Sequence, residues 1–162
     1  AVGGFFLNNQ LTDFSFRAVD DDGRRVANAV AAGKRPRSSM SPVIVLRRDD
    51  RGFVAALGSP GGSAILAYNA KALVGLLLWD LPLQQSFDLP NVIARGEDFY
   101  GEMSKISPEL AAGLAERGVQ LKSGRGEESG LHGVALQGPG RSEFAGAADR
   151  RREGVWGEAK EQ

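Results

Sequence analysis

The sequence predicts a single domain of mixed α/β class, in which strands paired as hairpins pack against one long and one shorter helix. Two apolar runs separated by a charged turn predict a hairpin, and a long apolar segment with helical spacing follows it. A serine–proline pair marks the start of a second helix. The length of 162 residues and the apolar content of 42% fit one globular domain over residues 1–162.

The predicted strands begin near the start of the chain. Phe5–Leu7 is expected to be the end of a strand, because polar residues follow it at once. Pro42–Leu46 is rich in β-branched residues and predicts a strand, Asp49–Gly52 predicts a turn, and Phe53–Leu57 predicts the returning strand. Both strands of this hairpin are continuously apolar, which favours a sheet covered on both faces.

A glycine-rich turn, Gly58–Ser63, joins the second strand to an apolar segment over Ala64–Trp79. We expect Ser63 to cap the helix, because a serine hydroxyl can accept a hydrogen bond from the first-turn N–H groups. The apolar segment is shorter than the ~20 residues that cross a bilayer, and polar residues interrupt it. It therefore predicts a buried core helix and no membrane span.

The remaining elements are short. Prolines predict a loop-rich stretch over Leu81–Gly101. Ser107 at the N-cap and Pro108 at the first helical position predict a helix that ends at Gly118. Three further strands are expected, with a Gly-Pro-Gly turn between the last two, at Val119–Leu121, Gly133–Leu136 and Phe144–Ala147.

Composition excludes several kinds of chemistry. Twenty Lys and Arg balance twenty Asp and Glu, so the chain lacks the positive charge of a nucleic-acid binder. The absence of cysteine excludes disulfides and thiolate sites. His132 is the single histidine, which argues against a zinc site or a histidine triad and favours a structural role for it. We expect neither a metal nor a cofactor.

The glycine turn carries the strongest chemical signal. A turn between a strand and a helix start presents backbone N–H groups at the positive end of the helix dipole. Such a turn can hold a phosphate, a carboxylate or the oxyanion of an acyl-transfer intermediate. Close packing of the helix on the strand would also explain the glycines. The turn lacks the spacing of nucleotide-binding loops and of the serine-hydrolase elbow.

Polar residues gather in three other loops, at Asn8–Asp13, Lys34–Pro42 and Ala148–Arg150. The second of these loops ends where one hairpin strand begins, and the glycine turn begins where the partner strand ends. A tight hairpin would therefore bring Ser38 and Ser39 to the same end of the sheet as Gly61 and Gly62. Together these groups resemble half of a site, with binding groups and an oxyanion hole but no nucleophile.

Three motifs in this order resemble the small subunit of γ-glutamyltranspeptidases, also called γ-glutamyltransferases or glutathione hydrolases. They are Leu7–Ser15, Gly33–Pro42 and Gly58–Ser63. Gly146–Gly154 is similar to the closing motif of that family, with Arg150 where the family usually has proline. The resemblance covers essentially the whole chain. It implies an N-terminal-nucleophile hydrolase fold, an αββα sandwich of which this chain forms a part.

The resemblance also implies an enzyme made as a zymogen, whose autocatalytic cleavage frees a threonine at the N-terminus of the small subunit. That threonine attacks the γ-glutamyl carbonyl with its own α-amine as base, and the glutamyl group passes to water, an amino acid or a peptide. Gly61 and Gly62 would supply the oxyanion-hole N–H groups. The threonine is expected upstream of Ala1, so this chain alone would be inactive. Thr12 is not that threonine, because it occupies a position where the family often has aspartate.

The remaining roles concern the glutamyl group. The resemblance implies that Ser38 and Ser39 bind its α-carboxylate, and that Gln10 and Asp13 hold its α-ammonium, Asp13 through a charge-assisted contact. The implied partners are the large subunit, which contributes a further arginine to the carboxylate, the missing N-terminal part of the small subunit, and glutathione or another γ-glutamyl compound. The implied location is periplasmic or secreted.

Two alternatives remain open. A related acylase on the same scaffold would act on glutaryl side chains, which lack the α-amine that Asp13 would bind, so Asp13 favours a glutamyl substrate. A non-enzymatic anion-binding module built on the glycine turn would bind its ligand without any upstream threonine.

Overall fold

The structure, a computed structural model, describes residues 3–4, 7–124 and 128–157. It divides the chain into two compact units, Ala1–Ser39 and Met40–Gln162, and each is described here by itself. The single domain over residues 1–162 stays a prediction. Part of the strand expected at Phe5–Leu7 lies outside the described residues, and Leu7 itself has no regular structure.

The first unit is organised by side-chain hydrogen bonds around a 3-10 turn, η1 (Gln10–Asp13). The Asn28 amide Nδ2 donates to the Asp13 carbonyl oxygen at 2.6 Å, and the Asn28 Oδ1 accepts from the Arg37 N–H at 3.0 Å. Phe14 is the buried aromatic side chain beside this turn. Asn28 therefore ties the segment at Asp13 to the segment that leads into Ser38.

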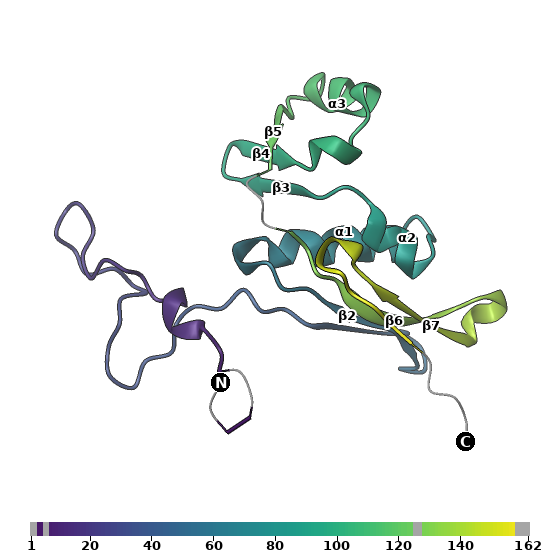
Figure 1. The fold of residues 1–162 in the computed structure, drawn as a ribbon, viewed down its shortest axis with the longest axis horizontal. Helices are drawn as coiled ribbons and strands as arrows, with labels where there is room; N and C mark the ends of the chain where they lie inside the picture. Colours follow the sequence, from purple (N-terminus) through teal and green to yellow (C-terminus); the bar gives the residue numbers. More distant parts are fainter. Residues whose placement is uncertain (1–2, 5–6, 125–127, 158–162) are drawn as a thin grey trace. The chain divides into compact units, whose positions relative to one another are not determined.

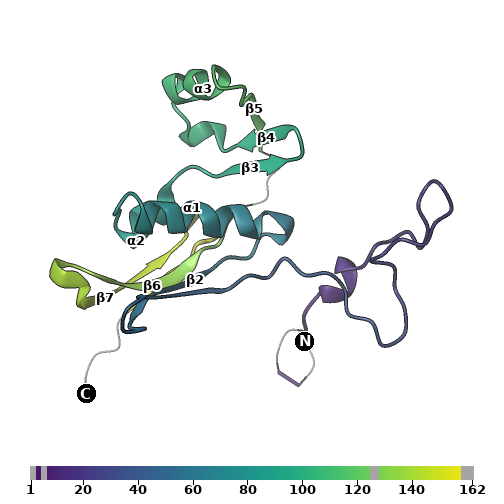
Figure 2. The ribbon, with the colours of Figure 1, turned by 180° about the vertical axis from the view of Figure 1, so that it is seen from behind.

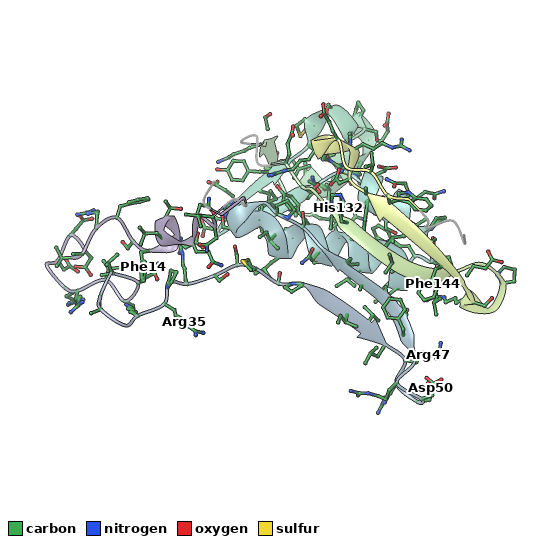
Figure 3. The ribbon with its side chains drawn as sticks, turned by 60° about the horizontal axis from the view of Figure 1, so that its bottom comes forward. Phe14, Arg35, Arg47, Asp50, His132 and Phe144 are labelled. Atoms are coloured by element: carbon green, nitrogen blue, oxygen red, sulfur yellow. The ribbon has the colours of Figure 1, made fainter. Side chains whose placement is uncertain are left out.

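The second unit is built on a four-stranded antiparallel sheet in the order β1–β2–β6–β7 (Figure 1). The strands are β1 (Val43–Leu46), β2 (Phe53–Gly58), β6 (His132–Gln137) and β7 (Glu143–Ala148). The first hairpin is confirmed, and Arg47 closes its turn by a two-pronged contact with Asp50 at 2.9 Å (Figure 3). The β6–β7 hairpin with its Gly-Pro-Gly turn is confirmed as well.

Helices α1 (Ile65–Leu77) and α2 (Leu83–Asp88) cover one face of this sheet (Figures 1 and 2). The core between them includes small residues on the strands and larger side chains such as Tyr68 and Phe87 on the helices. The opposite sheet face leaves apolar side chains exposed, with Ile44 at 70% and Val134 at 43%. Within the described residues the sheet is therefore covered on one face only, which gives one α layer and one β layer of the expected sandwich.

The prolines of Leu81–Gly101 wrongly predicted a loop. This stretch contains α2, β3 (Val92–Arg95) and β4 (Asp98–Gly101), and β3 pairs with β4 in antiparallel fashion. Pro82 is the N-cap of α2, where its missing N–H costs no helical hydrogen bond, and Pro90 lies between two elements. Neither proline therefore interrupts regular structure.

The helix starts were predicted with mixed success. Ser63 is not the N-cap of α1, because a 3-10 turn, η2 (Gly62–Ala64), precedes that helix and Ala64 is its N-cap. The Ser63 hydroxyl instead accepts from the Arg95 guanidinium at 2.5 Å. At α3 (Pro108–Ala115) the predicted serine cap is confirmed.

The smaller sheet adds a third strand, β5 (Leu121–Ser123), which runs parallel to β4. The sequence placed this strand slightly early, at Val119–Leu121. Gly118 follows α3 with a φ of 81°, the left-handed conformation expected of a glycine after a helix. In the part of the chain that the structure describes, no helix is long and apolar enough to span a membrane.

Candidate active site

The glycine turn has one closed side and one open side. Gly61 has a φ of 135°, and a Cβ atom on it would lie 2.5 Å from the ring of the buried Tyr68. Gly62 has a φ of 55°, and a Cβ atom on it would meet nothing within 4 Å. Only glycine satisfies the first position, because any side chain there would collide with Tyr68. The turn is therefore pressed onto the core on one side and accessible on the other.

Hydrogen bonds to the carbonyl oxygens of Pro60 and Gly61 hold the two peptide groups that carry the Gly61 and Gly62 N–H groups. The Ser59 hydroxyl donates to the Pro60 carbonyl oxygen at 2.7 Å. The Gly61 carbonyl oxygen accepts from the Ala64 N–H at 3.0 Å. The turn thus leads directly into η2 and α1, where the dipoles of the aligned peptides favour negative charge at the start of the helix. This arrangement can stabilise a carboxylate or an oxyanion.

A short segment behind the turn supports it. The Gly130 N–H donates to the Ser59 hydroxyl oxygen at 3.0 Å. A Cβ atom on Gly130 would lie 2.8 Å from the Pro60 ring, and one on Gly61 would lie 3.7 Å from the Glu128 carbonyl oxygen. The backbone at 128–130 is therefore in direct contact with the glycine turn.

This supporting segment is attached to a buried carboxylate, Asp149, whose exposed fraction is 0%. The Ser129 hydroxyl donates to Asp149 Oδ2, and the Asn91 amide Nδ2 donates to the Ser129 oxygen at 3.0 Å. The backbone N–H of Asp149 donates to the Leu131 carbonyl at 2.7 Å. Burial alone would raise the pKa of Asp149, but the hydrogen bonds from Ser129 and the Arg151 N–H hold this pKa below its ordinary value.

Arg151 neutralises this carboxylate and a second one. Its guanidinium contacts Asp149 at 3.1 Å and forms a two-pronged pair with Glu102, with the shortest N–O distance at 2.7 Å. It also donates to the carbonyl oxygens of Phe87, in the last turn of α2, and of Leu89, the C-cap of that helix. Burial alone would lower the pKa of Arg151, but the two carboxylates raise it above its ordinary value. Burial alone would raise the pKa of Glu102, but its contacts with Arg151 hold that pKa below its ordinary value.

Lys71 meets the same two carbonyl groups from α1. Its Nζ atom donates to the oxygens of Phe87 at 2.8 Å and Leu89 at 2.9 Å. Burial, reinforced by the neighbouring Arg151 cation, lowers the pKa of Lys71 to about 8. Two cations thus converge on the end of α2, and the carboxylates of Asp149 and Glu102 balance their charge.

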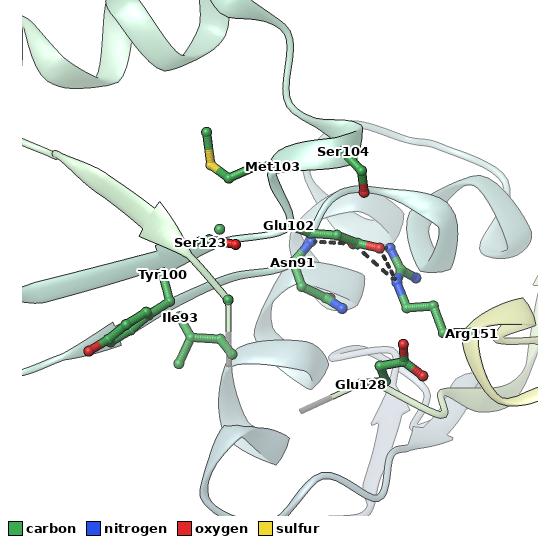
Figure 4. Close-up of a pocket in the computed structure, with 11 residues that line it drawn as sticks. Asn91, Ile93, Tyr100, Glu102, Met103, Ser104, Ser123, Glu128 and Arg151 are labelled. Atoms are coloured by element: carbon green, nitrogen blue, oxygen red, sulfur yellow. Dashed lines mark hydrogen bonds and ion pairs between the residues drawn. The ribbon is translucent and has the colours of Figure 1, made fainter. Parts of the chain in front are cut away.

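A cleft of about 330 Å³ opens beside these charges (Figure 4). Its walls include Tyr100 and Met103 from the region of the smaller sheet, and its floor includes the Glu102–Arg151 pair. The Oδ1 atom of Asn91 is buried there and has no hydrogen-bond partner among the residues that the structure describes. This orientation follows from the network. Because Ser129 donates its only hydroxyl proton to Asp149, its oxygen can only accept from Asn91, so the Asn91 amide N–H faces Ser129 and the Oδ1 atom points away.

The predicted substrate residues lie in the first unit. Gln10 and Asp13 are the two ends of η1, and Ser38 and Ser39 close the unit. Asp13 is exposed, and its carboxylate makes no hydrogen bond or ion pair with the described residues, while Thr12 uses its hydroxyl in the local turn, donating to the Asn9 carbonyl. Convergence of these side chains on the glycine turn stays a prediction.

The predicted residues of the second unit have different surroundings. Gly61 and Gly62 share one turn, and Arg150 is exposed beside Asp149. His132 begins β6 and its Nδ1 lies 3.0 Å from the Gly130 carbonyl oxygen (Figure 3), a local contact that fits a structural role. Among residues 3–4, 7–124 and 128–157, no group of three or more His, Asp or Glu side chains could hold a metal ion.

The sequence did not identify the supporting residues. The contacts that connect the supporting residues to the site span long stretches of sequence: 15 positions from Asn28 to Asp13, 20 from Ser129 to Asp149, 49 from Glu102 to Arg151 and 71 from Gly130 to Ser59. No spacing rule connects residues that far apart. The closing motif around Asp149 was the one sequence feature that could have indicated this network, because an aspartate and arginines directly follow an apolar strand there.

Loss of the central cation should destabilise the fold. We expect Arg151→Leu to lower the free energy of unfolding by about 3–5 kcal/mol, because Asp149 and Glu102 would remain without their counter-charge. Denaturant unfolding of the protein as its gene encodes it would measure this. Arg150→Leu is the matched control, since this neighbouring side chain is exposed, and its effect should stay within about 0.5 kcal/mol. Equal losses for the two variants would contradict the structural account.

Comparison with known proteins identifies relatives of the chain. The family model for gamma-glutamyltranspeptidase matches residues 1–159. The glutathione hydrolase proenzyme of Pseudomonas sp. (strain A14) is 28% identical over 92% of this chain and 28% of that protein. The glutathione hydrolase proenzyme of Escherichia coli (strain K12) is 32% identical over 91% of this chain and 26% of that protein. The chain thus spans little more than a quarter of the length of these curated relatives.

Solved structures agree in fold. A highly active mutant of the gamma-glutamyltranspeptidase from Pseudomonas nitroreducens superimposes with a TM-score of 0.77 and 28% identity, over 99% of this chain and 84% of that one. A Helicobacter pylori gamma-glutamyltranspeptidase mutant gives a TM-score of 0.76 at 25% identity, over 93% of this chain and 83% of that one. These neighbours confirm the predicted α/β fold of the N-terminal-nucleophile hydrolase type. The chain belongs to the gamma-glutamyltranspeptidase family.

Proposed function

We propose that this chain is part of a γ-glutamyltransferase or glutathione hydrolase that cleaves γ-glutamyl amides such as glutathione through a γ-glutamyl-enzyme intermediate. The glutamyl group then passes to water, an amino acid or a peptide. In this proposal the chain contributes the oxyanion hole and the glutamyl-binding side chains, and an upstream threonine freed by self-cleavage contributes the nucleophile. The chain alone is then inactive.

The geometry of the glycine turn carries the proposal. An oxyanion hole needs backbone N–H groups held rigidly before the charge develops, and an open side from which the reacting carbonyl can enter. Gly61 is pressed on Tyr68, and the space beside Gly62 is open. Both preceding carbonyl groups are held by hydrogen bonds. The turn therefore meets the structural requirements of a preorganised oxyanion hole.

Recognition of the glutamyl group rests on the first unit. Its α-ammonium requires a carboxylate, and the exposed Asp13 offers one, with Gln10 at the other end of the same turn. Its α-carboxylate requires hydroxyl donors, which Ser38 and Ser39 carry. The Asn28 amide joins the backbone at Asp13 to the backbone just before Ser38, which supports a shared binding surface for the two ends of an amino acid.

Asp13 also favours the glutamyl substrate over the glutaryl alternative, because a glutaryl group has no ammonium to balance a desolvated carboxylate. No observation in the structure favours the non-enzymatic anion-binding module. That module would bind an anion without any upstream threonine and would show no self-cleavage or turnover in the first experiment below.

The proposed partners are the large subunit and the N-terminal part of the small subunit. The exposed apolar face around Ile44 and Val134 supports this, because the family's fold places a second sheet against such a face and apolar patches of this kind mark interaction sites. We further propose a periplasmic or secreted location for the assembled enzyme.

The first experiment is expression of the full gene, followed by separation of the chains and assay of γ-glutamyl-anilide hydrolysis. We expect self-cleavage into two chains and turnover. Gly62→Pro removes one proposed oxyanion donor and also forces the backbone away from its φ of 55°, so it should lower kcat by at least about 10²–10³. Gly62→Ala keeps the N–H and is the comparison variant, with a smaller loss that reflects the strain of the left-handed backbone, about 1–2 kcal/mol. A folded, uncleaved and inactive wild-type precursor would overturn the proposal.

A second experiment tests the glutamyl assignment. Asp13→Asn should raise the KM for a γ-glutamyl anilide about 10- to 100-fold, since a hydrogen bond to a charged group contributes about 1.5–3 kcal/mol. The KM for the corresponding glutaryl anilide should stay unchanged. Asp21→Asn, a change at another exposed aspartate of the same unit, is the control. Equal changes for both substrates would favour the glutaryl alternative.

A further inference from the structure

We propose that Ser59 is a positioning residue that sets the direction of one oxyanion-hole N–H group, and that the buried Ser129–Asp149 pair acts on the hole through it. This inference rests on the proposed function and assigns a role to side chains outside the glutamyl-binding set. Ser59 itself does not touch the substrate.

The argument begins with the planarity of the peptide group. The Pro60 carbonyl and the Gly61 N–H belong to one trans peptide plane and point in opposite directions. The Ser59 hydroxyl donates to this carbonyl at 2.7 Å. Whatever fixes the carbonyl also fixes the N–H, so Ser59 determines where the Gly61 N–H points.

The peptide plane of the second donor is held by the start of the helix. The Gly61 carbonyl shares its plane with the Gly62 N–H and accepts from the Ala64 N–H at 3.0 Å. The helix start thus helps to orient the plane that carries the Gly62 N–H. The plane that carries the Gly61 N–H is held by the Ser59 hydroxyl, and a single substitution at Ser59 can therefore loosen it.

The Ser59 hydroxyl is itself oriented from behind. A hydroxyl has one proton and two lone pairs. The Gly130 N–H occupies a lone pair at 3.0 Å, which leaves the proton for the Pro60 carbonyl. Gly130 is held in turn because its neighbour Ser129 donates to the ionised Asp149. The buried carboxylate is therefore linked to the proposed oxyanion hole by three hydrogen bonds, by the covalent Ser129–Gly130 backbone between the first and the second of them, and by the Pro60–Gly61 peptide plane.

The chemical consequence concerns the transition state more than substrate binding. A misdirected N–H weakens the contact to the oxyanion that develops during attack, whereas the glutamyl contacts of the ground state are unaffected. Ser59→Ala should therefore lower kcat about 10- to 100-fold, less than complete removal of a donor, and leave KM within about twofold. Ser59→Thr retains the hydroxyl and should restore most of the rate.

The experiment uses the protein as its gene encodes it, with γ-glutamyl anilide as substrate and the melting temperature as a check on folding. Ser142→Ala is the matched control, because Ser142 also donates to a proline carbonyl, that of Pro139, in a turn at the far end of β6 and β7. We expect it to leave kcat and KM unchanged.

The outcomes separate the two proposals. An inactive wild-type protein would overturn the proposed function itself. An active wild-type protein whose Ser59→Ala variant keeps its kcat would overturn the positioning role and leave the proposed function intact. A Ser59→Ala loss that falls entirely on KM, or that Ser59→Thr does not restore, would equally overturn it.

Discussion

The second unit depends on one constraint, the burial of Asp149. A carboxylate with no exposure to water is tolerated only when it is paired and hydrogen-bonded. Arg151 and Ser129 meet this requirement together, and each is anchored elsewhere, Arg151 on Glu102 and on the end of α2, Ser129 on Asn91. The charge of one side chain thereby fixes β7, α2, the smaller sheet and the segment behind the glycine turn relative to one another.

This arrangement explains how a loop can have the rigidity that the proposed oxyanion hole requires. Catalytic donors must be in place before charge develops, and loops are ordinarily the more mobile parts of a protein. Here the turn at Gly61 and Gly62 lies between the start of α1 and the segment that Asp149 holds. The Ser129–Asp149 pair and Tyr68, which lie outside the turn, make it rigid. The side of the turn at Gly62, from which the proposed substrate would enter, therefore stays open.

Local signals in the sequence predicted the elements that depend on local chemistry. The hairpin of Pro42–Leu57, the serine cap of α3 and the glycine turn follow from residue types and spacing, and the structure has all three. The stretch Leu81–Gly101 was predicted wrongly, because its prolines lie at element boundaries that only packing reveals. The Ser63 cap failed because a 3-10 turn precedes α1 and makes Ala64 its N-cap, and the Ser63 hydroxyl accepts from the distant Arg95.

The buried network was out of reach of sequence patterns for the same reason, since it joins α2 to residues that flank β3, β6 and β7 by contacts between positions far apart in the chain. Through Gly130 and Ser59 it reaches the turn that we propose as the oxyanion hole. The most direct measurement is a double-mutant cycle on kcat in the full-length protein, with Ser59→Ala, Ser129→Ala and both together. A connected network predicts that the double variant loses little more than the more damaging single change, with a coupling of about 1 kcal/mol or more. Losses that simply multiply would contradict the connection.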